Sequence, residues 1–451
     1  MSSGTKRVAV IGAGLAGCEA AWQIAKRKIF VDLFEMRPVV KSPAHFSNDF
    51  GELVCSNSLR SNQLINAVGL LKQEMRLLDS VVIKTADANA VPAGRALAVD
   101  RTGFSATLTE RIETHPQINV RREKIDNLRQ LREKYDALVV ATGPLTEKIL
   151  ADDLKKVLGE EYLYFYDAIS PIVYADSLDH EVVFRGSRYD DGEGDYLNVP
   201  LDKKSYDILT SALIESDTVP LHPFEKSLYF EGCVPVEELA RRGPETLAHG
   251  PLKPVGLLDP RFDSQPHAVI QLRQEDKAGV LYNLVGFQTK LRIGDQRRIL
   301  HGLPGMSEAA FARFGSIHRN TFVNSPRSLS NSLSLVSLDK IYLAGQITGV
   351  EGYAESAAIG LLAGIFCSFE LFGLDRPDPP STSAHFALLR HLRESSAKRF
   401  QPMNITFGLF PPIDVPLLSG PKRIARRQKH TRLAERAIQS IPSYARSVES
   451  L

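Results

Sequence analysis

The sequence predicts an α/β fold in which a nucleotide-binding domain is assembled from distant parts of the chain. Residues 7–11 are predicted to form a strand, and a glycine-rich turn leads from it into an apolar helix at 18–26. Far downstream, residues 341–353 run from another short apolar strand into a second glycine-rich turn, and a small-residue helix is predicted at 354–363. Such strand–turn–helix units are typical of a Rossmann-like parallel sheet.

The first turn has the Gly-x-Gly-x-x-Gly spacing of dinucleotide-binding proteins, between a strand and a helix as that motif requires. Gly12 permits the tight turn, Gly14 lets the backbone approach a pyrophosphate, and Gly17 lets helix and strand pack closely. The helix N-terminus adds unpaired N–H groups and a positive dipole. The alternative is a glycine turn without a ligand. We predict cofactor binding by Gly12, Ala13, Gly14, Leu15, Ala16 and Gly17.

Three further features extend this prediction from a nucleotide to a flavin. A second strand, at 29–34, ends in Glu35, whose carboxylate can accept hydrogen bonds from both ribose hydroxyls of an adenosine. The strand at 136–141 ends in small residues, and the distal turn offers backbone N–H groups to a second anion or to a ring edge. The remaining predicted contacts are Ala141, Thr142, Gly143, Gly345, Gln346, Gly349 and Glu351. An NAD-only fold rarely needs all of these, so we predict an FAD-binding domain of the glutathione-reductase type.

The split site implies a discontinuous domain. We assign residues 1–150 and 335–375 to the FAD-binding domain, 151–334 to an α+β insertion domain and 376–451 to a mostly helical C-terminal segment with a basic tail. The predicted strands of the insertion cover residues 162–172, 181–185, 227–230, 267–272 and 280–287.

Composition narrows the possible class of protein. The chain has 451 residues, of which 43% are hydrophobic, enough for two or three domains with substantial cores. The longest apolar stretch, 357–369, is too short to span a bilayer, and no signal core precedes residue 7, so we expect a cytoplasmic protein without membrane contact. The net charge of +2 gives no general attraction to nucleic acid.

Two of the four cysteines lie in polar or turn-forming surroundings. Cys55 precedes Ser-Asn-Ser-Leu-Arg, and Cys233 lies between Gly232 and Val234-Pro235. Either could be a reactive thiol or a small buried hydrophobe, whereas Cys18 and Cys367 lie on apolar helices. Since no Cys-x-x-Cys pair or histidine cluster accompanies them, we expect neither a metal site nor a disulfide framework.

Several long segments together identify a family. Residues 8–17, 53–60, 230–235, 252–257 and 343–353 closely resemble those of bacterial methylenetetrahydrofolate- and FAD-dependent tRNA (uracil-5-)-methyltransferases, a small GidA-like family. The resemblance covers almost the whole chain. One departure is Val199, where we expect some relatives to carry cysteine.

The resemblance implies a reaction and its cofactors. 5,10-Methylenetetrahydrofolate would donate a one-carbon unit to C5 of uridine 54 in the T-loop of tRNA, with FAD reduced by NADH or NADPH as the reductant. Cys55 and Cys233 match the catalytic positions of the family: one thiol adds to uracil C6 and the other handles a proton. Cys55 is the weakly preferred nucleophile, but the sequence leaves the assignment open. No obligatory protein partner is expected.

A basic stretch near the C-terminus is the predicted RNA contact. Between residues 422 and 436 a single acid, Glu435, accompanies many cations, and the predicted RNA-binding residues are Lys422, Arg423, Arg426, Arg427 and Lys429. Without a tRNA substrate, a solvated helix face would be the simpler interpretation. Arg121, Arg122 and Lys124 form a weaker second patch.

Three other functions are considered. The first is a flavoprotein of the wobble-uridine tRNA modification type, which has a similar distal turn but is longer and carries a different thiol motif. The second is a non-methylating FAD protein that binds RNA or senses oxidation. The third is an NAD(P)H-dependent flavin oxidoreductase that acts on a small molecule without RNA.

Overall fold

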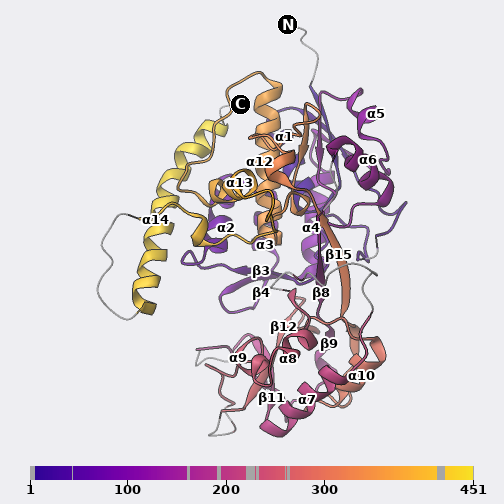
Figure 1. Ribbon diagram of the computed structural model, residues 1–451, viewed down its shortest axis with the longest axis vertical. Helices are drawn as coiled ribbons and strands as arrows, with labels where there is room; N and C mark the ends of the chain where they lie inside the picture. The colour runs from indigo at the N-terminus through magenta and orange to yellow at the C-terminus, as the bar shows by residue number, and fades with distance from the viewer. Residues whose placement is uncertain are drawn as a thin grey trace.

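The computed structural model describes residues 6–42, 44–159, 163–189, 194–219, 229, 233–259, 261, 265–413 and 422–449. In these residues the chain forms two lobes, which Figure 1 shows one above the other. The upper lobe contains both ends of the chain, and the lower lobe contains the elements from α7 to α10. Strands β8 (Leu163–Ile169) and β15 (Ser316–Phe322) pair antiparallel and run between the lobes.

The upper lobe is built on a five-stranded parallel sheet in the order β16-β7-β1-β2-β6. Its strands are β1 (Arg7–Ile11), β2 (Phe30–Phe34), β6 (Ile118–Arg121), β7 (Ala137–Val140) and β16 (Ile341–Leu343). β7 and β16 are apolar throughout, as is typical of parallel strands covered by helices. β16 pairs with β7 although residues 141–340 separate them, and the predicted α/β, Rossmann-like class is confirmed.

Helices α1 (Leu15–Lys26) and α12 (Tyr353–Leu371) cross in close contact behind this sheet. A Cβ atom on Gly360 would lie 2.2 Å from the backbone oxygen of Ala16, so only glycine allows this approach. α12 is longer than predicted, and it is the one described helix with the length and composition to cross a membrane; 89% of its most apolar window is buried inside the protein, as in a core helix.

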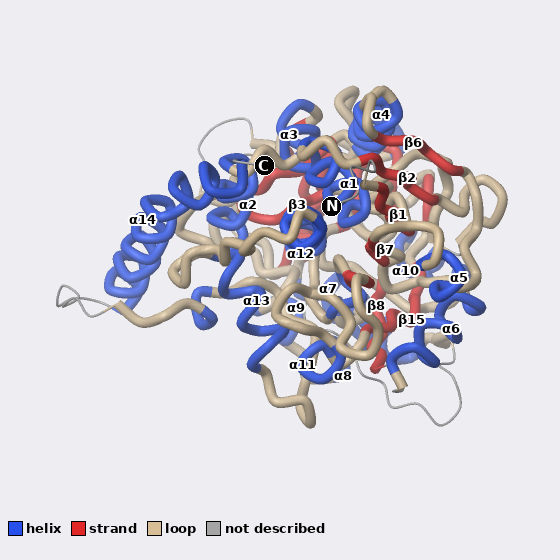
Figure 2. Tube along the Cα trace, turned by 90° about the horizontal axis from the view of Figure 1, so that it is seen from above, coloured by secondary structure: helices blue, strands red, loops and turns tan. Residues whose placement is uncertain are grey.

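The rest of the upper lobe packs around these helices. A three-stranded antiparallel sheet has the order β3 (Ser58–Ser61), β5 (Ala96–Val99), β4 (Ala90–Val91). The helices between β3 and β8 in the chain are α2 (Ala67–Leu77), α3 (Val81–Ala88), α4 (Arg101–Glu113), α5 (Leu128–Arg132) and α6 (Lys148–Leu158). Seen from above, α14 and the α5–α6 pair lie at opposite sides of the molecule (Figure 2).

The lower lobe has its own six-stranded sheet and core. The strand order is β10 (Phe184–Arg185), β11 (Tyr196–Leu201), β12 (Ala268–Gln274), β13 (Leu281–Leu284), β9 (Ile172–Tyr174), β14 (Phe311–Arg313), and all pairings are antiparallel. Its helices are α7 (Lys203–Glu215), α8 (Val236–Arg241), α9 (Thr246–His249) and α10 (Ile293–His301). The strand predicted at 162–172 is divided between β8 and β9. Of the strand predicted at 227–230, only Tyr229 is described, as a bridge to Tyr166.

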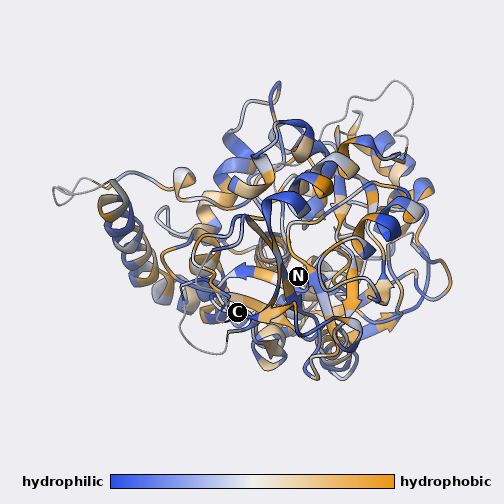
Figure 3. Ribbon diagram, turned by 90° about the horizontal axis from the view of Figure 1, so that it is seen from below, coloured by the Kyte–Doolittle hydropathy of each residue, from blue (hydrophilic) through white to orange (hydrophobic). Residues whose placement is uncertain are grey.

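The C-terminal segment returns to the upper lobe, as the short helix α11 (Ser325–Ser328) before it also does. α13 (Ala384–Glu394) and α14 (Lys422–Glu449) contribute buried side chains to the core around α1 and α12. α14 carries both hydrophilic and hydrophobic residues (Figure 3), and Leu433, Ala437 and Tyr444 are buried. The division at residues 150, 335 and 375 stays a prediction.

One buried acid makes the stability of the upper lobe depend on pH. Burial raises the pKa of Glu19 on α1 from 4.5 to about 7, even though Ser80 and the N–H of Val82 donate hydrogen bonds to its carboxylate. Because the pKa of Glu19 is higher in the folded protein, its contribution to the free energy of unfolding is fully present below about pH 4.5. This contribution is lost as the pH rises through 7. Between about pH 4.5 and pH 8 the free energy of unfolding should fall by about 3 kcal/mol more than in Glu19→Gln. Urea unfolding of both proteins measures this, and parallel pH profiles would contradict it.

Candidate functional site

A pocket of about 1140 Å³, including its open mouth, lies at the carboxyl ends of β1, β7 and β16. This is the position at which open parallel sheets bind ligands. The predicted residues that line it are Gly12, Gly14, Leu15, Ala16, Glu35, Ala141, Thr142, Gly143, Gly345 and Gln346. Ala13, Gly17, Gly349 and Glu351 do not line it.

The glycines of the first turn have distinct roles. Gly12 has φ +98°, and a Cβ there would lie 2.7 Å from the backbone oxygen of Ala141. A Cβ on Gly17 would lie 1.8 Å from the oxygen of Gly12, which makes glycine necessary for packing. A Cβ on Gly14 would meet nothing within 4 Å, since this residue opens onto the pocket. The turn therefore exposes its backbone to a ligand at Gly14.

Glu35 is held in place at the end of β2. Its carboxylate accepts hydrogen bonds from the backbone N–H of Ala13 (3.0 Å) and from the backbone N–H (3.0 Å) and Nε (2.9 Å) of Arg37. Burial alone would raise the pKa of Glu35, but the bonds from Arg37 outweigh it and hold the pKa below its usual value. The carboxylate is thus charged and has lone pairs left for a ribose hydroxyl.

The distal turn closes the other side of the pocket. Gly345 has φ +81°, and Gln346 donates a 2.6 Å hydrogen bond from Nε2 to Glu351. Gly349, with φ +91°, packs against Phe400 instead, where a Cβ would come within 2.5 Å. Gly349 and Glu351 therefore support the turn without lining the pocket.

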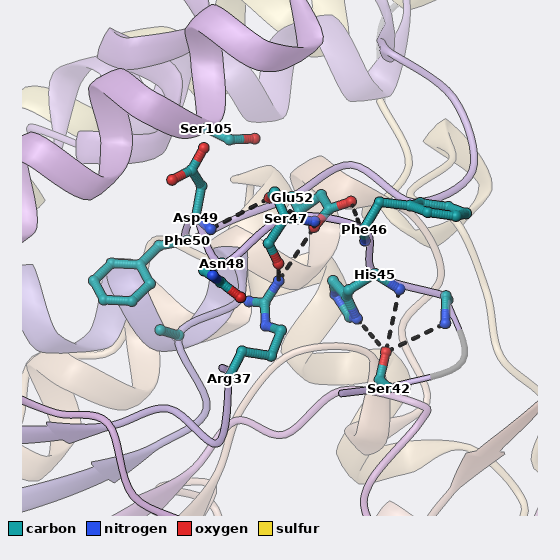
Figure 4. Close-up of polar contacts among 12 residues, drawn as sticks. Arg37, Ser42, His45, Phe46, Ser47, Asn48, Asp49, Phe50, Glu52 and Ser105 are labelled. Atoms are coloured by element: carbon teal, nitrogen blue, oxygen red, sulfur yellow. Dashed lines mark hydrogen bonds and ion pairs between the residues drawn. The ribbon is translucent and has the colours of Figure 1, made fainter. Parts of the chain in front are cut away.

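A loop between β2 and β3 also lines the pocket, through Arg37, Ser42, His45 and Glu52. Figure 4 shows how the loop folds around the Glu52 carboxylate, which accepts bonds from the N–H groups of Phe46 (2.9 Å) and Ser47 (3.0 Å). Burial, and then the charge of Arg37, lower the pKa of His45 to about 4, so its ring is neutral near pH 7. This loop could not be predicted from the sequence as part of the site, because its polar residues match no motif.

The structure brings Cys55 and Cys233 together although they come from different lobes. The two thiols lie within hydrogen-bonding reach of each other, and both residues are partly exposed, unlike the buried Cys18 and Cys367. Tyr353, at the start of α12, lines the pocket and accepts a 2.8 Å hydrogen bond from the Cys55 N–H. The thiol pair therefore adjoins the pocket through Tyr353.

The two thiols have opposite electrostatic surroundings. Arg101, Arg273 and Arg313 lie near Cys55, and Arg313 also donates to the Cys55 carbonyl at 3.3 Å. The surroundings of Cys55 are therefore positively charged.

Around Cys233 the neighbouring charges are negative. Its hydrogen bond to Cys55, then burial, then the Asp167 charge raise the pKa of Cys233 well above the usual value. Burial and the neighbouring Asp167 likewise raise the pKa of Glu351. Glu351 was predicted from the distal turn. The other charged neighbours match no motif, since they come from β8, α4, β12 and β14.

The predicted RNA-binding residues lie at the start of α14. Arg426, Arg427 and Lys429 are exposed, whereas the side chains of Lys422 and Arg423 lie outside the described residues.

The weaker patch is engaged within the protein. Arg121 pairs with Asp32, Arg122 with Glu113, and Lys124 with Asp126 and Glu147. Within the described part of the chain, no group of three or more His, Cys, Asp or Glu side chains could hold a metal ion.

Comparisons with known proteins agree with this geometry. The family model described as Glucose inhibited division protein A matches residues 7–375. Two proteins named methylenetetrahydrofolate--tRNA-(uracil-5-)-methyltransferase TrmFO are similar: that of Desulforamulus reducens is 52% identical and that of Anoxybacillus flavithermus 49%, over 97% and 98% of this chain and 97% and 100% of theirs.

A solved structure of Aquifex aeolicus GidA shares the fold, with a TM-score of 0.69 at 14% identity, and covers 100% of this chain and 75% of its own. The family resemblance predicted from the sequence is confirmed. The chain belongs to the glucose inhibited division protein A family and, within it, to the methylenetetrahydrofolate--tRNA-(uracil-5-)-methyltransferases.

Proposed function

We propose that this protein transfers a one-carbon unit from 5,10-methylenetetrahydrofolate to C5 of uridine 54 in the T-loop of tRNA, with FAD reduced by NADH or NADPH. The observation that carries the proposal is the meeting of two partly exposed thiols beside a dinucleotide pocket. A tRNA substrate implies a cytoplasmic location, and no protein partner is required by the chemistry.

The pocket fits FAD. Gly14 and Gly345 expose backbone on its two sides, the N-terminus of α1 favours a pyrophosphate, and Glu35 offers a charged acceptor to the ribose. Bound FAD would supply the electrons that convert the transferred carbon to a methyl group. His45 is neutral, and the negative charge of Glu52 is balanced by Arg37, which pairs with both Glu35 and Glu52. The loop would therefore line the same pocket without adding net negative charge.

The thiols supply the activation of uracil. C5 of uracil is a poor nucleophile until a thiolate adds to C6 and forms an enolate, and a base must later remove the C5 proton. Burial and the charge of Asp167 favour a protonated Cys233 in the resting protein, while three arginines surround Cys55. Both thiols are placed to share the two tasks, and which one adds to C6 stays open.

Isotope-labelled donor tests the proposed reaction. The purified protein is incubated without oxygen with unmodified tRNA transcript, NAD(P)H and carbon-labelled methylenetetrahydrofolate, and nucleosides are analysed by mass spectrometry. We expect labelled 5-methyluridine in the T-loop, and none when folate is omitted. Reduced flavin without labelled nucleoside would refute the proposal and favour a redox or RNA-binding role.

A flavoprotein of the wobble-uridine tRNA modification type is the second candidate, because the distal turn at 343–353 resembles that of this type. That type is longer, whereas this chain covers 97% to 100% of the methyltransferases that it resembles. The same nucleoside analysis separates the two, since a wobble product would appear in the anticodon loop.

The exposed cations of α14 are expected to bind tRNA phosphates. Replacing Arg426, Arg427 and Lys429 by alanine should weaken tRNA binding and reduce the slope of log K against log salt by about 2 to 3. The matched control replaces three exposed cations of α5 and α6, Arg129, Lys148 and Lys156, which lie across the molecule from α14 (Figure 2). Filter binding at several salt concentrations measures both. Equal loss in the two triple variants would indicate general charge rather than a site on α14.

A further inference from the structure

Asp167 on β8 is a carboxylate that the two-thiol chemistry does not yet use. Its carboxyl group lies within hydrogen-bonding reach of the Cys233 thiol and of the side chain of Asn320 on the paired strand β15. Its Oδ1 atom is buried and has no hydrogen-bond partner among the described residues. A buried carboxylate oxygen without a partner is costly, so such an atom calls for an explanation in a native structure.

Neighbouring groups restrain the carboxyl group of Asp167, while its Oδ1 atom has no hydrogen-bond partner among the described residues. The strand pairing of β8 with β15 fixes Asp167 opposite His318, two residues from Asn320, so the backbone positions the carboxyl group and Asn320 restrains it. The free Oδ1 has lone pairs available for a proton. A nucleophile, a base within hydrogen-bond reach and a third group that orients the base form the arrangement by which proteins activate thiols.

We propose that Asp167 is a further catalytic residue, the base that takes the proton from the Cys233 thiol. This inference rests on the proposed function of Cys233. In the step, the S–H bond of Cys233 breaks, an O–H bond forms on Asp167, and the electron pair stays on sulfur as a thiolate. The negative charge moves from oxygen to sulfur, and no oxidant or reductant takes part.

The surrounding groups determine when this transfer occurs. Asp167 interacts with the Cys233 thiol and with the Glu351 carboxyl group, and His318 lies opposite it in the strand pairing. Burial, and then the charge of Arg313, lower the pKa of His318, which keeps its ring neutral. Burial raises the pKa of Asp167 to about 6, against the bonds from Cys233 and Asn320. The proton therefore stays on sulfur in the resting protein. It moves to Asp167 as the sulfur atom forms a new bond, as in general base catalysis.

Two assays on Asp167→Asn give opposite results if the proposal holds. Removing the carboxylate charge should ease ionisation of the thiol, so iodoacetamide should label Cys233 about tenfold faster at pH 8, measured by peptide mass spectrometry. Single-turnover methylation should instead fall by about 10²- to 10⁴-fold, and the rise of the wild-type rate through about pH 6 should disappear. The loss of the rise through about pH 6 is the result that a purely structural role of Asp167 would not produce in a protein that retains FAD.

The control and a second variant keep the result interpretable. Asp176→Asn removes an exposed carboxylate a short distance along the chain and should change neither assay. Asp167→Glu keeps the carboxyl group on β8 and should restore the pH dependence in part. Unchanged labelling of Cys233, or methylation within threefold of wild type in Asp167→Asn, would overturn the proposal. If the wild-type protein makes no 5-methyluridine, the proposed function fails, while the labelling assay still decides whether Asp167 controls the Cys233 proton.

Discussion

Cys55→Ala and Cys233→Ala are each expected to reduce tRNA methylation by on the order of 10⁴-fold or more while FAD stays bound. Each variant removes a sulfur atom that the addition to C6 or the proton transfer needs. Neither sulfur lies in the glycine turns, and alanine keeps the Cys55 N–H that donates to Tyr353. Nucleoside mass spectrometry measures the methylation, and visible absorbance of the purified protein measures the flavin.

Cys367→Ala is the matched control for these variants. Cys367 lies buried on α12, away from the pocket, so its replacement should leave methylation unchanged at a modest cost in stability. Loss of flavin from both active-site variants would instead show that Cys55 and Cys233 hold the fold of the site.

Gly17→Ala is expected to lose FAD and to unfold at a lower temperature. The added methyl group would lie 1.8 Å from the backbone oxygen of Gly12, so the turn or the helix must move. Overpacking of this kind costs about 1 to 3 kcal/mol, and a displaced turn no longer offers its N–H groups to a pyrophosphate. Thermal unfolding and flavin absorbance measure the two effects.

Gly14→Ala separates packing from ligand contact. Its methyl group has no neighbour within 4 Å, so the unfolding temperature without FAD should equal that of the wild type. FAD should still bind more weakly, because the methyl group faces the pocket. Wild-type FAD occupancy in Gly17→Ala would show that the turn can shift without loss of function.

The parts of the fold that the sequence predicted well have strong local causes. β1 begins and ends as predicted because it is a short apolar run closed by a glycine turn, and β16 lies within the segment where a strand was predicted. The predicted end of α12 was too early. The helix is apolar on all sides and buried, so no polar face marks its length, and it continues to Leu371.

The thiol site was predicted only in part, for a physical reason. Cys55 and Cys233 were identified through long family segments, but nothing in their local sequence says that they meet. Their proximity depends on β8 and β15 bringing the lobes together, and Asp167 enters the site through that same pairing. Tertiary pairing of distant strands has no signature in a single sequence beyond the alternation of side chains.

The upper lobe is built from distant parts of the chain, and this determines the order in which the two lobes can fold during protein synthesis. Among the described residues, the core of the lower lobe is drawn from positions 173 to 309, so it is complete once that part has left the ribosome. The FAD pocket still lacks Ala344, Gly345 and Tyr353 at that moment, and α1 lacks the helix that packs on it. The first translated segment must therefore wait, with its apolar surface uncovered, until α12 is made. Capture of the flavin marks the near-completion of the chain.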